Sequence, residues 1–191
     1  VICMAHAARN AFNHCVLLGN GQRRGLPVNL VPEGRIATGF GPIIKLAGEI
    51  FSRVLSMSNP VSAQSLVVAA GMEDEAAFLP LVIERFERQT RALKRLAALE
   101  ALLSAQAMDI LGDKPEGVAR MLYEVVRKHA DFYVVDRPLS AEVEAIEEEL
   151  ASEAFVSEMI AHKPILAYDD FFALGSLERL EERLYRDTVV I

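Results

Sequence analysis

The segment from Leu96 to Leu111, LAALEALLSAQAMDIL, constrains the fold more than any other part of this chain. It has helical composition and is rich in alanine and leucine, and its polar residues are Glu100, Ser104, Gln106 and Asp109. A helix that is apolar on nearly every side must be buried on most of them. Gly112 and Pro115 follow, which is a usual stop signal for a helix.

The same helix is predicted to begin upstream, in or just after the acidic cluster Glu73 to Glu75. Carboxylates are favoured at a helix N-terminus because the unpaired N–H groups there carry partial positive charge. Pro80 indicates either a kink or a later start. A helix from Glu75 to Leu111 would be about 55 Å long. We therefore expect it to pack against another copy or another part of a larger protein, and we expect self-association through Leu96 to Leu111.

Composition excludes several classes of protein. The 191 residues are 52% hydrophobic but only 7% aromatic, so the apolar content is aliphatic and suits helix packing. A net charge of −7 and the lack of a basic arm argue against a nucleic-acid partner. No uncharged apolar run reaches the roughly 18 residues of a membrane span, and no secretory signal pattern is visible. We expect a cytoplasmic protein with no membrane partner.

Helical periodicity recurs along most of the chain, over 1–18, 42–57, 115–129 and 140–162, with a short helix expected over 176–187. Alternating strand pairs with turn signals are not found. The sequence therefore predicts an all-α fold, an elongated helical bundle with one long central helix. Pro164 breaks the pattern, so we divide the chain into a helical domain over 1–163 and a short helical extension over 164–191.

Two further stretches are open to more than one interpretation. Cys3, His6, His14 and Cys15 suggest zinc, but Cys3 and His14 would lie about 16 Å apart along one helix, and zinc ligands must converge within about 2.3 Å of the metal. We favour core or interface roles and predict no metal site. Residues 22–41 form a loop-rich connection without a phosphate-binding fingerprint, and its apolar residues, Leu26, Val28, Leu30 and Phe40, are expected to be partly tucked in.

Several short motifs, in order and at matching spacing, resemble the carboxy-terminal half of the aromatic amino acid ammonia-lyases and aminomutases, the histidine ammonia-lyase family. Gly25-Leu26-Pro27 and Ala37-Thr38-Gly39-Phe40 resemble the family's Gly-Leu-Pro and Asn-Ser-Gly-Phe. Asn59-Pro60-Val61-Ser62-Ala63-Gln64-Ser65 resembles His-Pro-Ala-Ser-Val-Asp-Ser, and Ala70-Gly71-Met72-Glu73-Asp74-Glu75 resembles Ala-Asn-Gln-Glu-Asp-His. Asp136-Arg137-Pro138-Leu139 resembles the closing segment. The resemblance runs to about Met159.

The resemblance implies roles for three residues. Phe40 matches the aromatic residue that packs against the substrate and the prosthetic group. Glu73 matches the glutamate near the substrate amino group, where a carboxylate can pair with an ammonium or assist proton transfer, and we assign it as the catalytic residue. Met72, beside it, is grouped with Phe40 as substrate-binding. The alternative for Glu73 is that it only caps the long helix.

The departures from the family concern its prosthetic group. Family members build an electrophilic methylidene-imidazolone (MIO) group from an internal Ala-Ser-Gly, whereas Ala69-Ala70-Gly71 here lacks the serine. The MIO group would have to come from a missing Ala-Ser-Gly segment, and the family's catalytic tyrosine and carboxylate-binding arginine are expected upstream of Val1.

Two functions follow from the resemblance. The first is a carboxy-terminal segment or subunit of an MIO-type ammonia-lyase acting on a histidine-like or tyrosine/phenylalanine-like amino acid, silent without its amino-terminal part. The alternative is a non-catalytic helical oligomerisation module that retains the family scaffold. The implied partners are further copies of the chain in a tetramer, or an amino-terminal lyase segment, together with a small-molecule amino acid.

Overall fold

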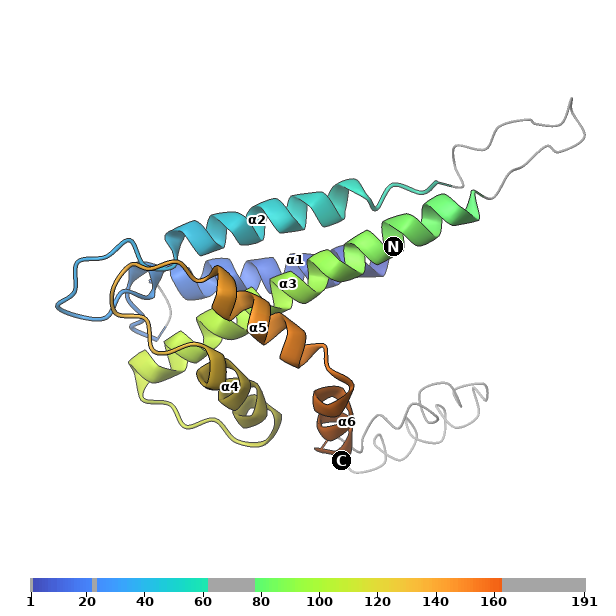
Figure 1. Cartoon of the computed structure of the whole chain (residues 1–191). Helices are drawn as coiled ribbons and strands as arrows, with labels where there is room; N and C mark the ends of the chain where they lie inside the picture. Colours follow the sequence, from blue (N-terminus) through green and yellow to red (C-terminus); the bar gives the residue numbers. More distant parts are fainter. Residues whose placement is uncertain (1, 22–23, 62–77, 163–191) are drawn as a thin grey trace, which may run out of the picture. The chain divides into compact units, whose positions relative to one another are not determined.

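The computed structural model describes residues 2–21, 24–61 and 78–162. In these ranges the chain is all-helical, as predicted, with six α-helices and one short 3-10 turn (Figure 1). The helices are α1 (Ile2–Gly19), α2 (Gly41–Ser56), α3 (Leu79–Leu111), α4 (Gly117–His129), α5 (Ser140–Leu150) and α6 (Glu153–His162), and the turn η1 is Val28–Leu30. The helix expected over 176–187 and the extension over 164–191 lie outside the described residues.

The long helix α3 begins at Leu79 rather than at the acidic cluster. Phe78 precedes it in a left-handed conformation, and Pro80 occupies its first turn, where the missing N–H costs no hydrogen bond. The later start that Pro80 indicated is therefore confirmed, and Glu73 to Glu75 lie outside the described residues. At its other end Gly112 adopts φ 67°, and the N–H groups of Gly112 and Asp113 donate to the carbonyls of Asp109 and Met108.

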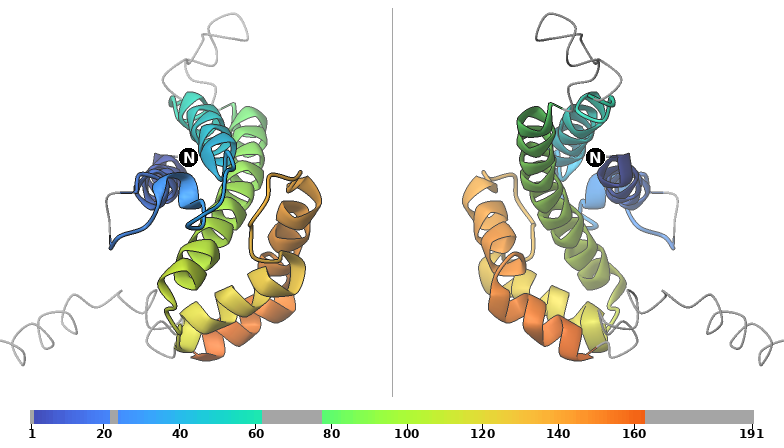
Figure 2. Two further views of the ribbon diagram at one scale, coloured as in Figure 1. Left: turned by 90° about the vertical axis from the view of Figure 1, so that its left-hand side faces the viewer. Right: turned by 90° about the vertical axis from the view of Figure 1, so that its right-hand side faces the viewer.

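The apolar half of α3 is buried by its own chain. Figure 2 shows α3 between the α1–α2 pair and α5, and α4 also contacts it. The residues that this arrangement buries are Leu96, Ala98, Leu99, Leu102, Leu103, Ala105 and Ala107. Four helices of the same chain therefore cover much of this segment, although Ala97 is exposed and Ala101, Met108, Ile110 and Leu111 are only partly buried. The argument for self-association is weakened, and self-association stays a prediction.

The remaining helices follow their sequence patterns with two differences. In α2, Ala47, Ile50 and Val54 are buried as expected, whereas Leu46 and Leu55 at the edges of the predicted apolar stripe are exposed. The helix predicted over 140–162 is two helices, α5 and α6. Ser152 separates them, and its hydroxyl accepts a hydrogen bond from the N–H of Phe155 at 3.2 Å, as a capping residue does.

Internal contacts divide the chain into two units, Val1–Ala151 and Ser152–Ile191. Helices α1 to α5 belong to the first unit, and all the sites described below lie in it. The sequence-based boundary at residue 163 stays a prediction. None of the described helices combines the length and the apolarity that crossing a bilayer requires.

Candidate functional site

Of the three residues assigned from the resemblance, the structure places one. Phe40 is the residue immediately before α2 and is fully buried. Its ring lies 5.0 Å from the ring of Tyr133 at a tilt of 53°, a favourable aromatic arrangement. Glu73 and Met72 lie outside the described residues, so their roles stay predictions. Phe40 is a core residue in this chain, and its predicted contact with a substrate also stays a prediction.

The loop that carries Phe40 is clamped by a carboxylate from far along the chain. The two oxygens of Asp136 accept hydrogen bonds from the backbone N–H groups of Thr38, at 2.7 Å, and Gly39, at 3.1 Å. The hydroxyl of Tyr133 donates to the same carboxylate at 3.1 Å. The bond from the Thr38 backbone is the main reason that the pKa of Asp136 lies below its usual range. The anionic form of Asp136 is therefore the form that holds the loop.

Gly39 is required by the close approach of the chain to itself. Its φ of +64° favours glycine, and a Cβ there would lie 2.4 Å from the carbonyl oxygen of Asn29. The next residue, Phe40, donates its N–H to that same carbonyl at 2.9 Å. The glycine of the Thr38-Gly39-Phe40 motif therefore lets the loop turn tightly enough to insert Phe40 into the core.

A buried glutamine secures the other side of Tyr133. Gln106 on α3 is fully buried; its side-chain nitrogen donates to the Tyr133 carbonyl at 2.9 Å, and its oxygen accepts from the Tyr133 N–H at 2.9 Å. Burial raises the pKa of the Tyr133 hydroxyl, so it stays protonated and able to donate to Asp136. We refer to Thr38, Gly39, Phe40, Gln106, Tyr133 and Asp136 as the Phe40 network.

The loop over residues 22–41 was predicted to be partly buried at four apolar positions, and three of them are buried. Leu26, Leu30 and Phe40 are buried, whereas Val28 is 64% exposed. Leu30 lies in the turn η1, where it faces the core and Val28 does not. The loop therefore belongs to the core of the first unit and is not a simple surface connector.

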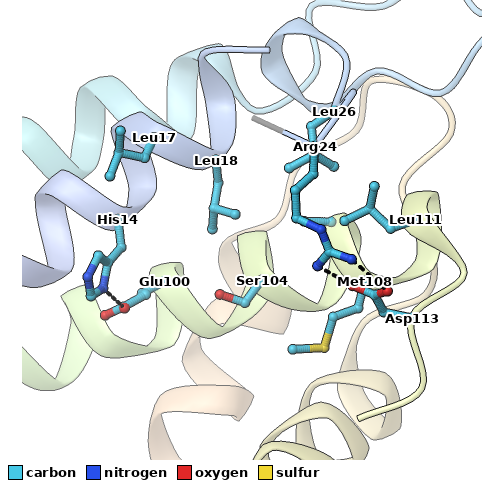
Figure 3. Close-up of a pocket in the computed structure, with 11 residues that line it drawn as sticks. His14, Leu17, Leu18, Arg24, Leu26, Glu100, Ser104, Met108, Leu111 and Asp113 are labelled. Carbon is cyan, nitrogen blue, oxygen red and sulfur yellow. Dashed lines mark hydrogen bonds and ion pairs between the residues drawn. The ribbon is translucent and has the colours of Figure 1, made fainter. Parts of the chain in front are cut away.

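A separate cavity of about 360 Å³ lies between α1, the segment Arg24–Leu26 and α3 (Figure 3). Two ion pairs border it: His14 Nδ1 lies 2.5 Å from Glu100 Oε1, and Arg24 contacts both carboxylate oxygens of Asp113 at 2.7 and 3.1 Å. Most of its other walls are aliphatic, from Leu17, Leu18, Leu26, Ala107 and Leu111. His14 is engaged with Glu100, and Arg24 with Asp113. The cavity therefore presents no free acid–base pair and no activated nucleophile.

The cysteines and histidines of α1 do not converge. Within the described residues, which include all four of these side chains, no group of three metal-ligating side chains could hold an ion. Burial, with Glu100 contributing, raises the pKa of the Cys15 thiol to about 12, so this thiol remains protonated and is a poor metal ligand.

Phe40 lies at one end of α2, and the described residues on either side of the segment that contains Met72 and Glu73 lie towards the other end. The 16 residues of α2 separate Phe40 from Met57 by about 24 Å. The described residues that flank Glu73 lie at the far end, where Arg85 on α3 donates to the Asn59 carbonyl at 2.9 Å. In sequence, Glu73 thus follows the end of the helix that Phe40 begins.

The comparisons with known proteins agree with the fold. The family profile described as aromatic amino acid lyase matches residues 1–128, and the chain belongs to that family. The histidine ammonia-lyase of Natranaerobius thermophilus is 26% identical over 136 residues, which are 71% of this chain and 27% of that enzyme.

Solved structures give the same result for the fold alone. Histidine ammonia-lyase from Trypanosoma cruzi superimposes with a TM-score of 0.74 at 20% identity, over 81% of this chain and 31% of that one. Tyrosine aminomutase from Streptomyces globisporus superimposes with a TM-score of 0.71 at 24% identity, over 85% of this chain and 31% of that one. The chain thus spans less than a third of the length of each of these relatives.

A change of Asp136 to asparagine tests the clamp through its pH dependence. An amide cannot accept both backbone N–H bonds as a carboxylate does, so we expect a lower melting temperature than the parent at pH 7. Because the pKa of Asp136 is lowered in the fold from an ordinary value of 3.8, its stabilisation is present above that value and disappears as the pH falls through the lower, folded pKa. The difference in melting temperature between parent and variant should therefore shrink as the pH falls below 3.8.

Asp113→Asn is the matched control for this measurement. It removes an exposed ion pair with Arg24, and exposed pairs contribute little. A difference for Asp136→Asn that is absent at pH 7, or no larger than that for Asp113→Asn, would show that Asp136 does not clamp the loop.

Proposed function

We propose that this chain is the carboxy-terminal segment or subunit of an MIO-type aromatic amino acid ammonia-lyase and carries one wall of its active site. The observation that supports this most strongly is the match of residues 1–128 to the family, combined with motifs in family order. The reaction is the non-oxidative elimination of ammonia from a histidine-like or tyrosine/phenylalanine-like amino acid. In this proposal the chain alone is silent.

The residues present do not fit the family's prosthetic group. The 191 residues contain no Ala-Ser-Gly triplet from which it could form. The aromatic residue that resembles its packing partner, Phe40, is fully buried against Tyr133 and offers it no surface. We therefore assign no catalytic step to that group in this chain.

In this proposal the chain contributes by holding parts of the active site in position. Gln106 and Asp136 fix Tyr133 and the Thr38–Phe40 loop, which sets one end of α2. Glu73 is the proposed catalytic carboxylate, and its role in this proposal is to pair with the ammonium of the substrate or to assist proton transfer. Positioning of this kind matters for rate, because a displacement of about 1 Å can cost roughly a hundredfold.

The missing parts would come from a partner. We propose an amino-terminal lyase segment carrying Ala-Ser-Gly, joined in cis or supplied in trans, or further copies of the chain in a tetramer. Several large apolar side chains in the first turns of α3 are exposed, namely Leu79, Leu81, Ile83 and Phe86.

The test is a substitution in the assembled protein. The chain is supplied with an amino-terminal lyase segment, and the formation of the unsaturated acid is followed by its ultraviolet absorbance. We expect Glu73→Gln to lower turnover by about a hundredfold, within the usual range for loss of general acid–base catalysis. Glu75→Gln, two residues away, is the matched control and should leave turnover near the parent's. Activity that appears but is unchanged by Glu73→Gln would make this carboxylate a helix cap.

The second candidate is a non-catalytic helical module. Gly71-Met72 in place of the family's Asn-Gln pair, and the absence of the Ala-Ser-Gly triplet, favour it. It predicts that the chain assembles with the amino-terminal segment, measured by co-purification, without any turnover.

A further inference from the structure

A cluster of arginines surrounds a second cavity, on the opposite half of α3 from the Phe40 network. This cavity has a volume of about 640 Å³ and lies between α2, α3 and α5. Four guanidinium-bearing side chains line it, Arg53 from α2 and Arg88, Arg91 and Arg95 from α3, with Glu147 from α5. Four arginines around one opening are notable in a chain whose net charge is −7.

The helical repeat explains why these arginines converge. Residues 88, 91 and 95 follow the spacing i, i+3 and i+7, which places them on one face of α3. Helix α2 runs beside this part of α3 (Figure 1), and Gln89 of α3 donates to the Val54 carbonyl at 2.9 Å. That contact brings Arg53 of α2 to the same opening as Arg88 and Arg91.

The four arginines differ in how strongly they are engaged. Arg95 is anchored by Glu147 at 2.6 Å and Glu144 at 3.5 Å. Arg53 pairs with Glu49 and Arg88 with Glu84, each one turn away on its own helix, and in both pairs the two side chains are more than half exposed. Arg91 forms no ion pair within the residues that the structure describes. One charge is therefore available, and two more are held only by exposed pairs, which contribute little.

We propose that this cavity binds a small polyanion, either a phosphate-bearing molecule or a polycarboxylate. The planar guanidinium presents a fork of donors that matches the oxygens of both groups. The volume lies in the range of small-molecule sites, and a ligand there would face Arg91 directly while Arg53 and Arg88 exchange their exposed partners for it. The site is independent of the proposed lyase function, since neither requires the other.

The test is calorimetric titration of the whole chain with pyrophosphate and, separately, with citrate, at constant ionic strength with sodium chloride as the reference salt. We expect saturable binding of at least one of the two, with about one ligand per chain. The probe that binds more tightly identifies the class, phosphate-bearing or polycarboxylate. Arg91→Gln should weaken that binding about tenfold, as expected for loss of a charge-assisted hydrogen-bond donor.

Arg120→Gln provides the matched control. Arg120 is an exposed arginine on α4 that pairs with Glu124, one turn away on the same helix, and it does not line the cavity. Arg53 and Arg88 also pair with a glutamate one turn away, on the other side in sequence. Its loss changes the net charge equally and should leave the affinity within about twofold of the parent's, as expected for a surface charge away from the site. No saturable binding of either probe, or equal weakening by Arg91→Gln and Arg120→Gln, would overturn the proposal.

Discussion

Phe40→Ala is expected to lower the free energy of unfolding by about 3–5 kcal/mol, the usual cost of removing a fully buried aromatic side chain. Phe40 has no exposed surface and packs against Tyr133, at the point where the loop enters α2. Its loss removes the apolar contact and leaves a cavity that the clamped loop cannot readily close. Urea denaturation followed by circular dichroism measures the effect directly.

Phe51→Ala is the control, on the helix α2 that Phe40 precedes. Phe51 stacks on Phe12 with ring centres 5.4 Å apart, but it is only partly buried. We expect Phe51→Ala to lower the free energy of unfolding by less than Phe40→Ala does. If Phe40→Ala costs no more than Phe51→Ala, then Phe40 is not a core residue, and a role at the surface of an active site is favoured instead.

Gln106→Met is expected to cost about 2–4 kcal/mol, because it leaves two buried backbone groups of Tyr133 without partners. Methionine fills a similar volume, so the loss is one of hydrogen bonds rather than of packing. The Tyr133 N–H and carbonyl each have Gln106 as a partner at 2.9 Å. The same denaturation experiment measures the change, and hydrogen exchange should show faster opening of residues 130–137.

Gln89→Met gives a comparison on the same helix. Gln89 is also fully buried, and its nitrogen donates to the Val54 carbonyl and the Ser58 hydroxyl. Among the residues that the structure describes, its oxygen has no hydrogen-bond partner. Gln89→Met therefore removes two hydrogen bonds but also an unsatisfied buried oxygen. It should lower the free energy of unfolding clearly less than Gln106→Met does. Equal costs for the two variants would mean that the pairing of Gln106 with Tyr133 contributes little.

Helix positions could be predicted from the sequence because their signals are local. Apolar periodicity predicts α1, α2 and α4 to within two residues at either end, and Gly112 predicts the end of α3. The break between α5 and α6 was missed, since Ser152 reads as one polar residue in a continuous helical pattern and acts as a cap only where the chain turns. The burial of Leu96 to Leu111 was also misjudged, because periodicity does not tell how many helices of the same chain return to cover a surface.

The Phe40 network could be predicted only in part. The Thr38-Gly39-Phe40 and Asp136-Arg137 motifs were both noted. The neighbouring sequence does not show, however, that Asp136 accepts hydrogen bonds from the backbone of Thr38 and Gly39, which lie almost a hundred positions earlier. Gln106 did carry a signal, as a polar residue within the almost wholly apolar segment from Leu96 to Leu111. A buried amide in such a setting needs a partner, and here the partner is the backbone of Tyr133.

The most direct measurement of the proposed function is turnover by the chain with and without an amino-terminal lyase segment. The purified chain is incubated with histidine, tyrosine or phenylalanine, and the ultraviolet absorbance of the unsaturated acid is followed. We predict no turnover by the isolated chain and turnover with at least one amino acid once a segment carrying Ala-Ser-Gly is supplied. Turnover by the isolated chain that survives purification would contradict the proposal, as would an assembled complex that remains inactive.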